Sequence, residues 1–268
     1  MISKLAKYGL EYNPFLKNSP DVKFVYDGYN QLMFRLKHLE NTKGMGLITG
    51  EPGLGKTTAI RHWTESLNKS LYKIIYISHQ SVGVQEFYRQ LCDELGLDVF
   101  HSKRKNFKNI QDEISRLVIE KRITPVIILD EANCIPSETL NDLKMLLNFE
   151  MDSRDNIILL LIGQSVIAST LERKSHEALR QRISMNYNLD RLTRAQTIEY
   201  IDMKLEKAGV ATPLLTTEAY NLIANASNGI PRVVNQIMDK ALLLLATTKD
   251  ADQINEEMMD SAIDENTI

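Results

Sequence analysis

One glycine-rich stretch near the start of the chain limits the possible folds more than any other feature. It reads GEPGLGKT and matches the pattern GxxxxGK[ST], whose glycines let consecutive backbone N–H groups turn towards one anion. A strand-like apolar segment precedes it at 46–49 and a helical pattern follows, so the positive end of a helix adds to the anion site. We expect this loop to bind the phosphates of a nucleotide through Gly50, Glu51, Pro52, Gly53, Leu54, Gly55, Lys56, Thr57 and Thr58.

Two side chains of the loop carry specific chemistry. The Lys56 ammonium is expected to reach the β- and γ-phosphates, and the Thr57 hydroxyl is expected to ligate Mg²⁺. The alternative is a chance glycine loop, but a random chain of this length contains the pattern with odds on the order of 1%. The position between a strand and a helix lowers those odds further, so ATP with Mg²⁺ is the expected ligand.

A second motif follows a buried strand. The apolar run at 126–129 ends in two adjacent acids, near the edge where a parallel sheet presents its ligand crevice. Asp130 is expected to hold Mg²⁺ through water, and Glu131 is expected to act as the general base that polarises water for attack on the γ-phosphate. The alternative is an aspartate that caps a helix beside a solvated glutamate. The phosphate loop upstream favours the functional interpretation.

The order of the predicted elements indicates an α/β fold with a parallel sheet. Strand patterns alternate with helical patterns, and the strands are continuous apolar runs typical of a sheet covered by helices on both faces. Strands are expected at 46–49, 73–77, 125–129 and 156–162. Helices are expected at 29–41, 57–67, 85–95, 110–121 and 137–149.

The pattern changes to helices alone after Asp190. Thr193 and Gln196 are spaced as a capping box, and Gly209 is expected to end the helix that follows. Further helices are expected at 216–226, 231–247 and 255–264. The predicted organisation is an N-terminal arm at 1–30, a P-loop ATPase domain at 31–190 and an all-helical lid domain at 191–268.

Composition restricts the possible partners and location. The formal net charge of the 268 residues is −3, so any contact with nucleic acid needs a local basic patch. Two cysteines exclude a disulfide scaffold and a CxxC zinc site, and they fit a reducing compartment. The chain has no signal-peptide pattern and no run of about 18 apolar residues, so we expect a cytoplasmic protein without a membrane span.

Three further segments complete a resemblance to the AAA+ ATPases, which combine a P-loop core with a helical lid. Gln164, after the predicted strand at 156–162, resembles the sensor-1 position. Arg180 and Arg182 lie in a segment, LRQRI, that resembles the one holding the arginine finger. Arg232 in GIPR resembles the sensor-2 arginine, at a helix start where a cation opposes the macrodipole. The alternative for Arg180 and Arg182 is that they lie on a solvated helix face. The alternative for Arg232 is a charged side chain at a helix N-terminus without a role in catalysis.

The resemblance narrows to two subfamilies. The segments YGLEYNPF at 8–15, LDEAN at 129–133 and LRQRI at 179–183 resemble the general secretion pathway A-type ATPases. They equally resemble the AAA+ helper ATPases of transposable elements, the relatives of the phage Mu target-selection ATPase. The secretion ATPases carry a membrane span and a periplasmic domain after the ATPase module, and neither precedes Ile268 here. On that basis we expect the transposon helper.

This resemblance implies a mechanism and partners. Such ATPases assemble with themselves on double-stranded DNA in the ATP state, as a ring or filament, recruit a transposase and disassemble on hydrolysis. Hydrolysis then needs an arginine from a neighbouring subunit. A secretion-pathway or helicase-loader role is the alternative within the class. Outside it, a P-loop small-molecule kinase and a nucleotide-gated scaffold with little turnover remain open, although Glu131 argues for the activation of water.

One basic run offers a candidate DNA surface. It contains four cations and no acid, namely Lys103, Arg104, Lys105 and Lys108. Such a cluster neutralises phosphates without reading the base sequence. The alternative is a solvated loop, because basic clusters are common on protein surfaces.

Overall fold

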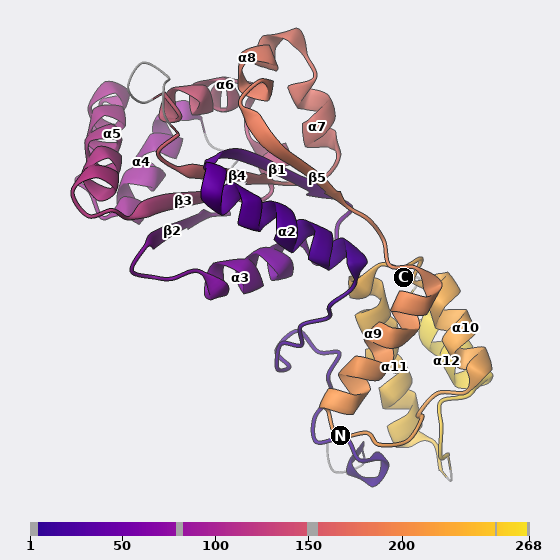
Figure 1. Cartoon of the computed structure of the whole chain (residues 1–268). Helices are drawn as coiled ribbons and strands as arrows, with labels where there is room; N and C mark the ends of the chain where they lie inside the picture. Colours follow the sequence, from indigo (N-terminus) through magenta and orange to yellow (C-terminus); the bar gives the residue numbers. More distant parts are fainter. Residues whose placement is uncertain (1–4, 79–82, 149–154, 250, 267–268) are drawn as a thin grey trace. The chain divides into compact units, whose positions relative to one another are not determined.

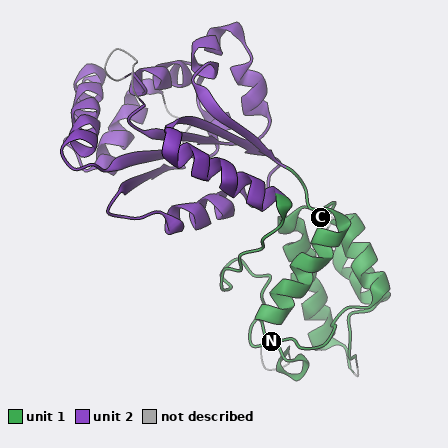
Figure 2. Ribbon diagram, viewed as in Figure 1, with its two compact units in different colours: residues 1–27, 53–55, 190–268 green, residues 28–52, 56–189 purple. Residues whose placement is uncertain are grey.

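The computed structural model describes residues 5–78, 83–148, 155–249 and 251–266. It divides into two compact units (Figure 2). Unit 1 consists of Met1–Asp27, Gly53–Gly55 and Asp190–Ile268, and unit 2 of Gly28–Pro52 and Lys56–Leu189. Each unit has its own apolar core. Across the described ranges, none of the helices combines the length and the apolarity that a segment crossing a bilayer needs.

Unit 2 is built on a five-stranded parallel sheet. Its strands lie side by side in the order β2-β3-β4-β1-β5 (Figure 1). They are β1 (Gly44–Gly50), β2 (Tyr72–Ile77), β3 (Thr124–Leu129), β4 (Ile158–Ile162) and β5 (Ile183–Leu189). Every residue of β4 is buried, as expected for a central strand covered on both faces. The predicted α/β fold with a parallel sheet is confirmed.

Strand β5 was not predicted, and its sequence explains why. The strand lies at the edge of the sheet, where it pairs with β1 alone. Its residues alternate between the buried Met185 and Leu189 and the exposed Asn186 and Asn188. Because half of the strand is polar, it lacks the continuous apolar run that identifies the central strands.

Helices cover both faces of the sheet. Helices α2 and α3 lie on one face, and α4 to α7 lie on the other (Figure 1). Leu39 of α2 and Trp63 of α3 are buried on the first face, and Tyr88 and Leu91 of α4 are buried on the second. The helices of unit 2 are α2 (Asp27–Thr42), α3 (Lys56–Ser66), α4 (Val84–Leu95), α5 (Lys103–Ile119), α6 (Ser137–Leu146), α7 (Val166–Leu171) and α8 (Glu177–Arg180), with 3₁₀ turns η2 (Ala132–Cys134) and η4 (Lys174–His176).

Two helix boundaries differ from the sequence prediction by more than two residues. Helix α5 begins at Lys103 rather than at Ile110, so the basic run is helical and not a loop. The fully buried Asn106 side chain explains the early start, because it bonds both the N–H and the C=O of Phe100 at 2.8 and 2.9 Å. Helix α6 ends at Leu146, and the expected end at Phe149 lies outside the described residues.

Unit 1 contains the predicted helical bundle. Its helices are α9 (Arg194–Lys207), α10 (Thr217–Ala226), α11 (Pro231–Thr247) and α12 (Glu256–Asp264). The capping box before α9 is confirmed: Thr193 Oγ1 accepts from the N–H of Gln196, and Gln196 Oε1 accepts from the N–H of Thr193. Gly229 precedes α11 with φ +70°, and a Cβ there would lie 2.1 Å from Leu192 O. A side chain is therefore sterically excluded at this glycine.

The N-terminal segment, predicted as an arm over 1–30, is grouped with unit 1 up to Asp27, and its bounds as a separate domain stay a prediction. From residue 5 onwards it contains the 3₁₀ helix η1 (Ala6–Tyr8), and then α2 begins at Asp27. Leu10 and Phe15 join the apolar core of the helical bundle, and Asn13 Nδ2 donates to Asp239 Oδ1 at 2.7 Å. This packing has a physical reason: the apolar residues of the segment lack periodicity, yet they bury surface against the bundle.

Candidate nucleotide-binding site

The phosphate loop connects β1 to the first turn of α3, as the sequence predicts. Gly53 and Gly55 have φ values of +88° and +91°, a region that side chains other than glycine rarely adopt. Among the described residues other than its chain neighbours, nothing lies within 4 Å of the position that a Cβ would take at Gly55, so there is open space beside this glycine. The loop leads directly into the N-terminus of α3, an end of a helix that suits an anion.

The Lys56 side chain lies along the loop. Its Nζ donates to Gly50 O and to Glu51 O, at 2.8 Å in both cases. These carbonyls hold the ammonium at the loop, where a phosphate is expected to bind.

The two predicted motifs meet at the end of the sheet. Thr57 Oγ1, in the first turn of α3, donates to Asp130 Oδ2 at 2.8 Å. Asp130 directly follows β3 and is only 5% exposed, and its N–H donates to Ile77 O at the end of β2. This hydrogen bond therefore joins the phosphate loop to the acidic pair, although the two residues lie 73 positions apart in the sequence.

Tyr76 is a third member of this cluster that sequence reasoning missed. Its hydroxyl donates to the same Asp130 Oδ2 at 2.7 Å. Burial, followed by this hydrogen bond and the charge of Asp130, raises the pKa of Tyr76, so it remains a hydrogen-bond donor at neutral pH. Tyr76 faces Ile128 in the parallel register of β2 and β3. The sequence does place Tyr76 one residue before the end of a strand. That position points to Asp130 only when the strand is known to be the neighbour of β3.

Glu131 has an unusual backbone conformation. Its φ is +52°, in the left-handed region, and its N–H donates to Asp130 Oδ1 at 2.9 Å. A residue other than glycine in this region costs about 1–2 kcal/mol, and such conformations cluster at functional sites. The side chain is exposed next to Asp130, which fits the predicted general base.

Asn133 links the acidic motif to the segment after β4. Its Oδ1 accepts from the N–H of Gln164 at 3.0 Å. A Cβ at Gly163 would lie 2.8 Å from the same oxygen, so this close approach needs glycine. Gln164, the predicted sensor-1 residue, is therefore held by its backbone at the same edge of the sheet as Asp130, because β3 and β4 are parallel neighbours.

Arg180 and Arg182 lie at the opposite edge of the sheet from the phosphate loop. Arg182 precedes β5, whose first residue, Ile183, pairs with Met45 near the start of β1, whereas the loop follows Gly50 at the end of β1. The intervening strand spans roughly 16 Å. That separation exceeds the reach of one side chain. The predicted arginine-finger role of these residues stays a prediction.

Arg232 lies in the first turn of α11 and is exposed. Within unit 1, its N–H donates to Gly53 O at 3.2 Å. A Cβ at Gly53 would lie 2.8 Å from the Cβ of Arg232. Its predicted sensor-2 role toward a phosphate stays a prediction.

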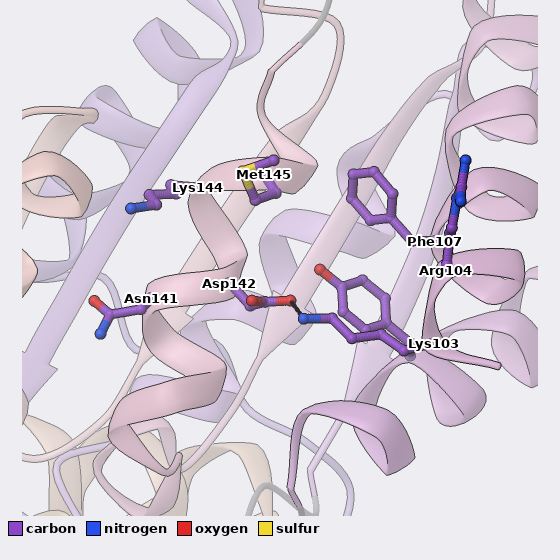
Figure 3. Close-up of a pocket in the computed structure, with 8 residues that line it drawn as sticks. Lys103, Arg104, Phe107, Asn141, Asp142, Lys144 and Met145 are labelled. Carbon is purple, nitrogen blue, oxygen red and sulfur yellow. Dashed lines mark ion pairs between the residues drawn. The ribbon is translucent and has the colours of Figure 1, made fainter.

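The four cations of the basic run differ in their surroundings. Lys103 Nζ lies 2.6 Å from Asp142 Oδ2 in an ion pair between α5 and α6 (Figure 3). Arg104, Lys105 and Lys108 are exposed. The charge of Lys103 is thus partly neutralised, and Lys105 Nζ lies 5.6 Å from the centroid of the Phe100 ring. Contact with DNA stays a prediction.

Comparison with known proteins gives two sequence matches. Residues 39–171 match a family model described as an AAA domain. Over 242 residues the chain is 31% identical to General secretion pathway protein A of Aeromonas hydrophila. That match covers 88% of this chain but 44% of the relative, so the chain spans less than half of the relative's length.

Solved structures share the fold. The Aeropyrum pernix ORC2 protein in ADPNP-ADP complexes aligns with a TM-score of 0.69 at 17% identity, over 95% of this chain and 71% of that one. The Aeropyrum pernix ORC1 protein in complex with DNA aligns with a TM-score of 0.67 at 18% identity, over 94% of this chain and 68% of that one. Residues 39–171 are thus similar to an AAA domain, and the chain shares its fold, with the parallel sheet and the phosphate loop, with these solved structures.

Proposed function

We propose that the chain binds ATP with Mg²⁺ and hydrolyses it to ADP and phosphate. The observation that carries this proposal is the 2.8 Å hydrogen bond from Thr57 Oγ1 to Asp130 Oδ2. These two oxygens fit Mg²⁺, which usually takes one or two protein ligands and keeps waters and substrate phosphates. When bound, the ion neutralises charge that develops on the phosphoryl oxygens.

The other residues of the site have separate roles in this proposal. Lys56 and the backbone N–H groups of the loop bind the phosphates. The Glu131 carboxylate takes a proton from the attacking water. Gln164 orients the water or the γ-phosphate from the neighbouring strand end, and Arg232 contacts a phosphate from the lid.

Catalysis requires a second subunit in this proposal. The support is the position of Arg180 and Arg182 at the start of β5, roughly 16 Å along the sheet from their own phosphate loop. One of them reaches the γ-phosphate of a neighbouring copy, where an arginine finger is worth about 10³–10⁵ in rate. Assembly of a homo-oligomer and hydrolysis are therefore coupled.

We further propose that the oligomer assembles on double-stranded DNA and recruits or regulates a transposase. The exposed Arg104, Lys105 and Lys108 supply cations for the phosphate backbone, and Lys103 contributes less because it pairs with Asp142. The DNA complex of the ORC1 protein, which has a similar fold, supports DNA as a ligand class. The transposase follows from the resemblance of the three sequence segments alone.

A role in a secretion pathway is the second candidate. The specific observation in its favour is the 31% identity to General secretion pathway protein A over 242 residues. A secretion role uses the same proposed nucleotide chemistry but needs no DNA. Dependence on DNA therefore separates the two candidates.

The experiment is a salt titration of affinity for double-stranded DNA, with ATP present. Neutralised phosphates release counterions, so we expect affinity to fall steeply with salt and to vary little with DNA sequence. Replacing the basic run by alanine should flatten the slope, and this variant changes Lys103, Arg104, Lys105 and Lys108. The control removes exposed cations elsewhere in unit 2, namely Lys69, Arg173 and Lys174.

Equal slopes for the wild type and the basic-run variant would refute this run as the DNA surface. Absence of DNA binding under all conditions, with ATP hydrolysis intact, would favour the secretion candidate.

A further inference from the structure

A pocket of about 420 Å³ opens between α4, α5 and α6 of unit 2. None of its lining residues belongs to the nucleotide motifs. Figure 3 shows the ring of Phe107 and the side chain of Met145 on facing helices, with the Lys103–Asp142 ion pair nearby. A volume of this size lies at the small end of ligand pockets, about 300–1,000 Å³, and holds one or two side chains.

The walls of the pocket are apolar although the pocket opens to the surface. Phe107 is half-buried, and Met145 is 42% exposed. An exposed methionine at a concave surface is typical of peptide-binding sites, because its flexible thioether adapts to the shape of the inserted group. An apolar side chain would therefore be the natural occupant.

The charged residues of the lining are mainly cationic. Lys103, Arg104 and Lys144 stand against the single anion Asp142, which pairs with Lys103. Arg104 and Lys144 extend from α5 and α6 away from the centre of the pocket (Figure 3). Two cations thus flank an apolar centre, and this distribution is complementary to carboxylates on either side of an apolar group.

Tyr88 supplies the second, independent observation. The residue is fully buried at the pocket wall. Burial, followed by the charge of Asp142 and a hydrogen bond to it, raises the pKa of Tyr88, so the hydroxyl keeps its proton. The geometry of that contact falls short of a normal hydrogen bond, and Asp142 also pairs with Lys103. A carbonyl oxygen from a ligand would therefore be a better acceptor for this donor.

We propose that this pocket is the docking site for an acidic segment of a partner protein. The segment inserts one apolar side chain between Phe107 and Met145, places carboxylates beside Arg104 and Lys144, and offers a carbonyl oxygen to the Tyr88 hydroxyl. A polypeptide supplies all three groups at once. Double-stranded DNA does not, because its bases are stacked and its phosphates lie on a convex surface. The proposal does not depend on the DNA contact proposed above.

The test is selection from a displayed library of random dodecapeptides on the full chain. We expect enriched peptides to combine a leucine, phenylalanine or tryptophan with neighbouring aspartate or glutamate. A synthetic copy of the most enriched peptide should bind the wild type, and Met145→Glu should weaken that binding by about tenfold or more, as a central contact would. Ile119→Glu is the control, because Ile119 is a 68% exposed apolar residue on α5, a helix that borders the pocket, but does not line the pocket itself.

A second variant addresses the buried hydroxyl. Tyr88→Phe should weaken the peptide's affinity several-fold while the melting temperature changes little, because the hydroxyl makes no hydrogen bond of normal geometry in the free protein. A purely structural tyrosine would not change the peptide's affinity.

Three results would overturn the proposal. The selection could return no acidic family, or the peptide could bind Met145→Glu as tightly as the wild type. A fluorescent single-stranded oligonucleotide could also displace the peptide and lose its own binding in Met145→Glu, which would assign the pocket to nucleic acid.

Discussion

Lys204 should lower the stability of unit 1 at neutral pH, and Lys204→Met should remove this cost. Lys204 lies on α9, is only 9% exposed, and donates to Asn235 Oδ1 at 3.3 Å. Its ammonium also lies 5.3 Å from the ring centroids of Phe15 and of Tyr200. Desolvation by burial lowers the pKa of Lys204 from 10.5 to about 8, and the charge of Asp21 opposes that change only in part.

The direction of the pH dependence of stability follows from proton binding at Lys204 in the folded and unfolded states. Between pH 8 and 10.5 the unfolded chain binds a proton at this lysine and the folded chain does not, so stability rises with pH in that window. Below pH 8 the whole cost is present, and it is roughly 3 kcal/mol at pH 7. From pH 7 to pH 9 the unfolding free energy of the wild type should rise by about 1 kcal/mol through this group.

The assay is urea denaturation at pH 7, 8 and 9, followed by circular dichroism. Lys204→Met should raise the unfolding free energy at pH 7 by roughly 2 kcal/mol, because the lost hydrogen bond offsets about 1 kcal/mol of the gain. The Lys204→Met variant should also lack the rise in unfolding free energy between pH 7 and pH 9. Lys207→Met, an exposed lysine on the same helix, is the control. Fluorescence of Trp63 reports on unit 2 and should be unchanged. An identical pH dependence in wild type and variant would refute the reasoning.

Three further predictions test other parts of the molecule. Tyr76→Phe removes one hydrogen bond to Asp130 and should weaken Mg·ADP binding by about fivefold, with metal-free ADP binding unchanged, as measured by calorimetry. Gly229→Ala places a Cβ 2.1 Å from Leu192 O and should lower the urea midpoint of unit 1, at a cost of about 2 kcal/mol or more; an unchanged midpoint would contradict the geometry. Inactive Arg180→Ala/Arg182→Ala protein mixed with inactive Lys56→Ala protein should regain ATPase activity, and a mixture that stays inactive would argue against a finger in trans.

The sequence was sufficient for those parts of the site that lie in continuous motifs. The phosphate loop and the Asp130–Glu131 pair are each adjacent in sequence, and the apolar strands that precede them mark the same edge of a parallel sheet. That Thr57 and Asp130 meet therefore follows from the motifs and the fold class together.

The missed residues depend on strand order and register. Tyr76 reaches Asp130 because β2 is the neighbour of β3, and Asn188 accepts from Thr49 Oγ1 at 3.1 Å because β5 is the neighbour of β1. Neither pairing can be predicted from local periodicity. Strand β5 itself was not predicted, because its polar residues interrupt the apolar run. The N-terminal segment joined the helical core for a similar reason: Phe15 is buried by tertiary packing, not by a periodic pattern.

The central claim is that this chain turns over ATP at the site formed by the phosphate loop and the acidic pair. The direct measurement compares ATP binding and steady-state phosphate release for wild type, Lys56→Ala and Glu131→Gln. Lys56→Ala should lose binding because the charge that meets the phosphates is gone, whereas Glu131→Gln should bind ATP and release no phosphate, since an amide does not accept the proton of water. Phosphate release by Glu131→Gln at the wild-type rate would contradict the assignment of the base, and full ATP binding by Lys56→Ala would contradict the site itself.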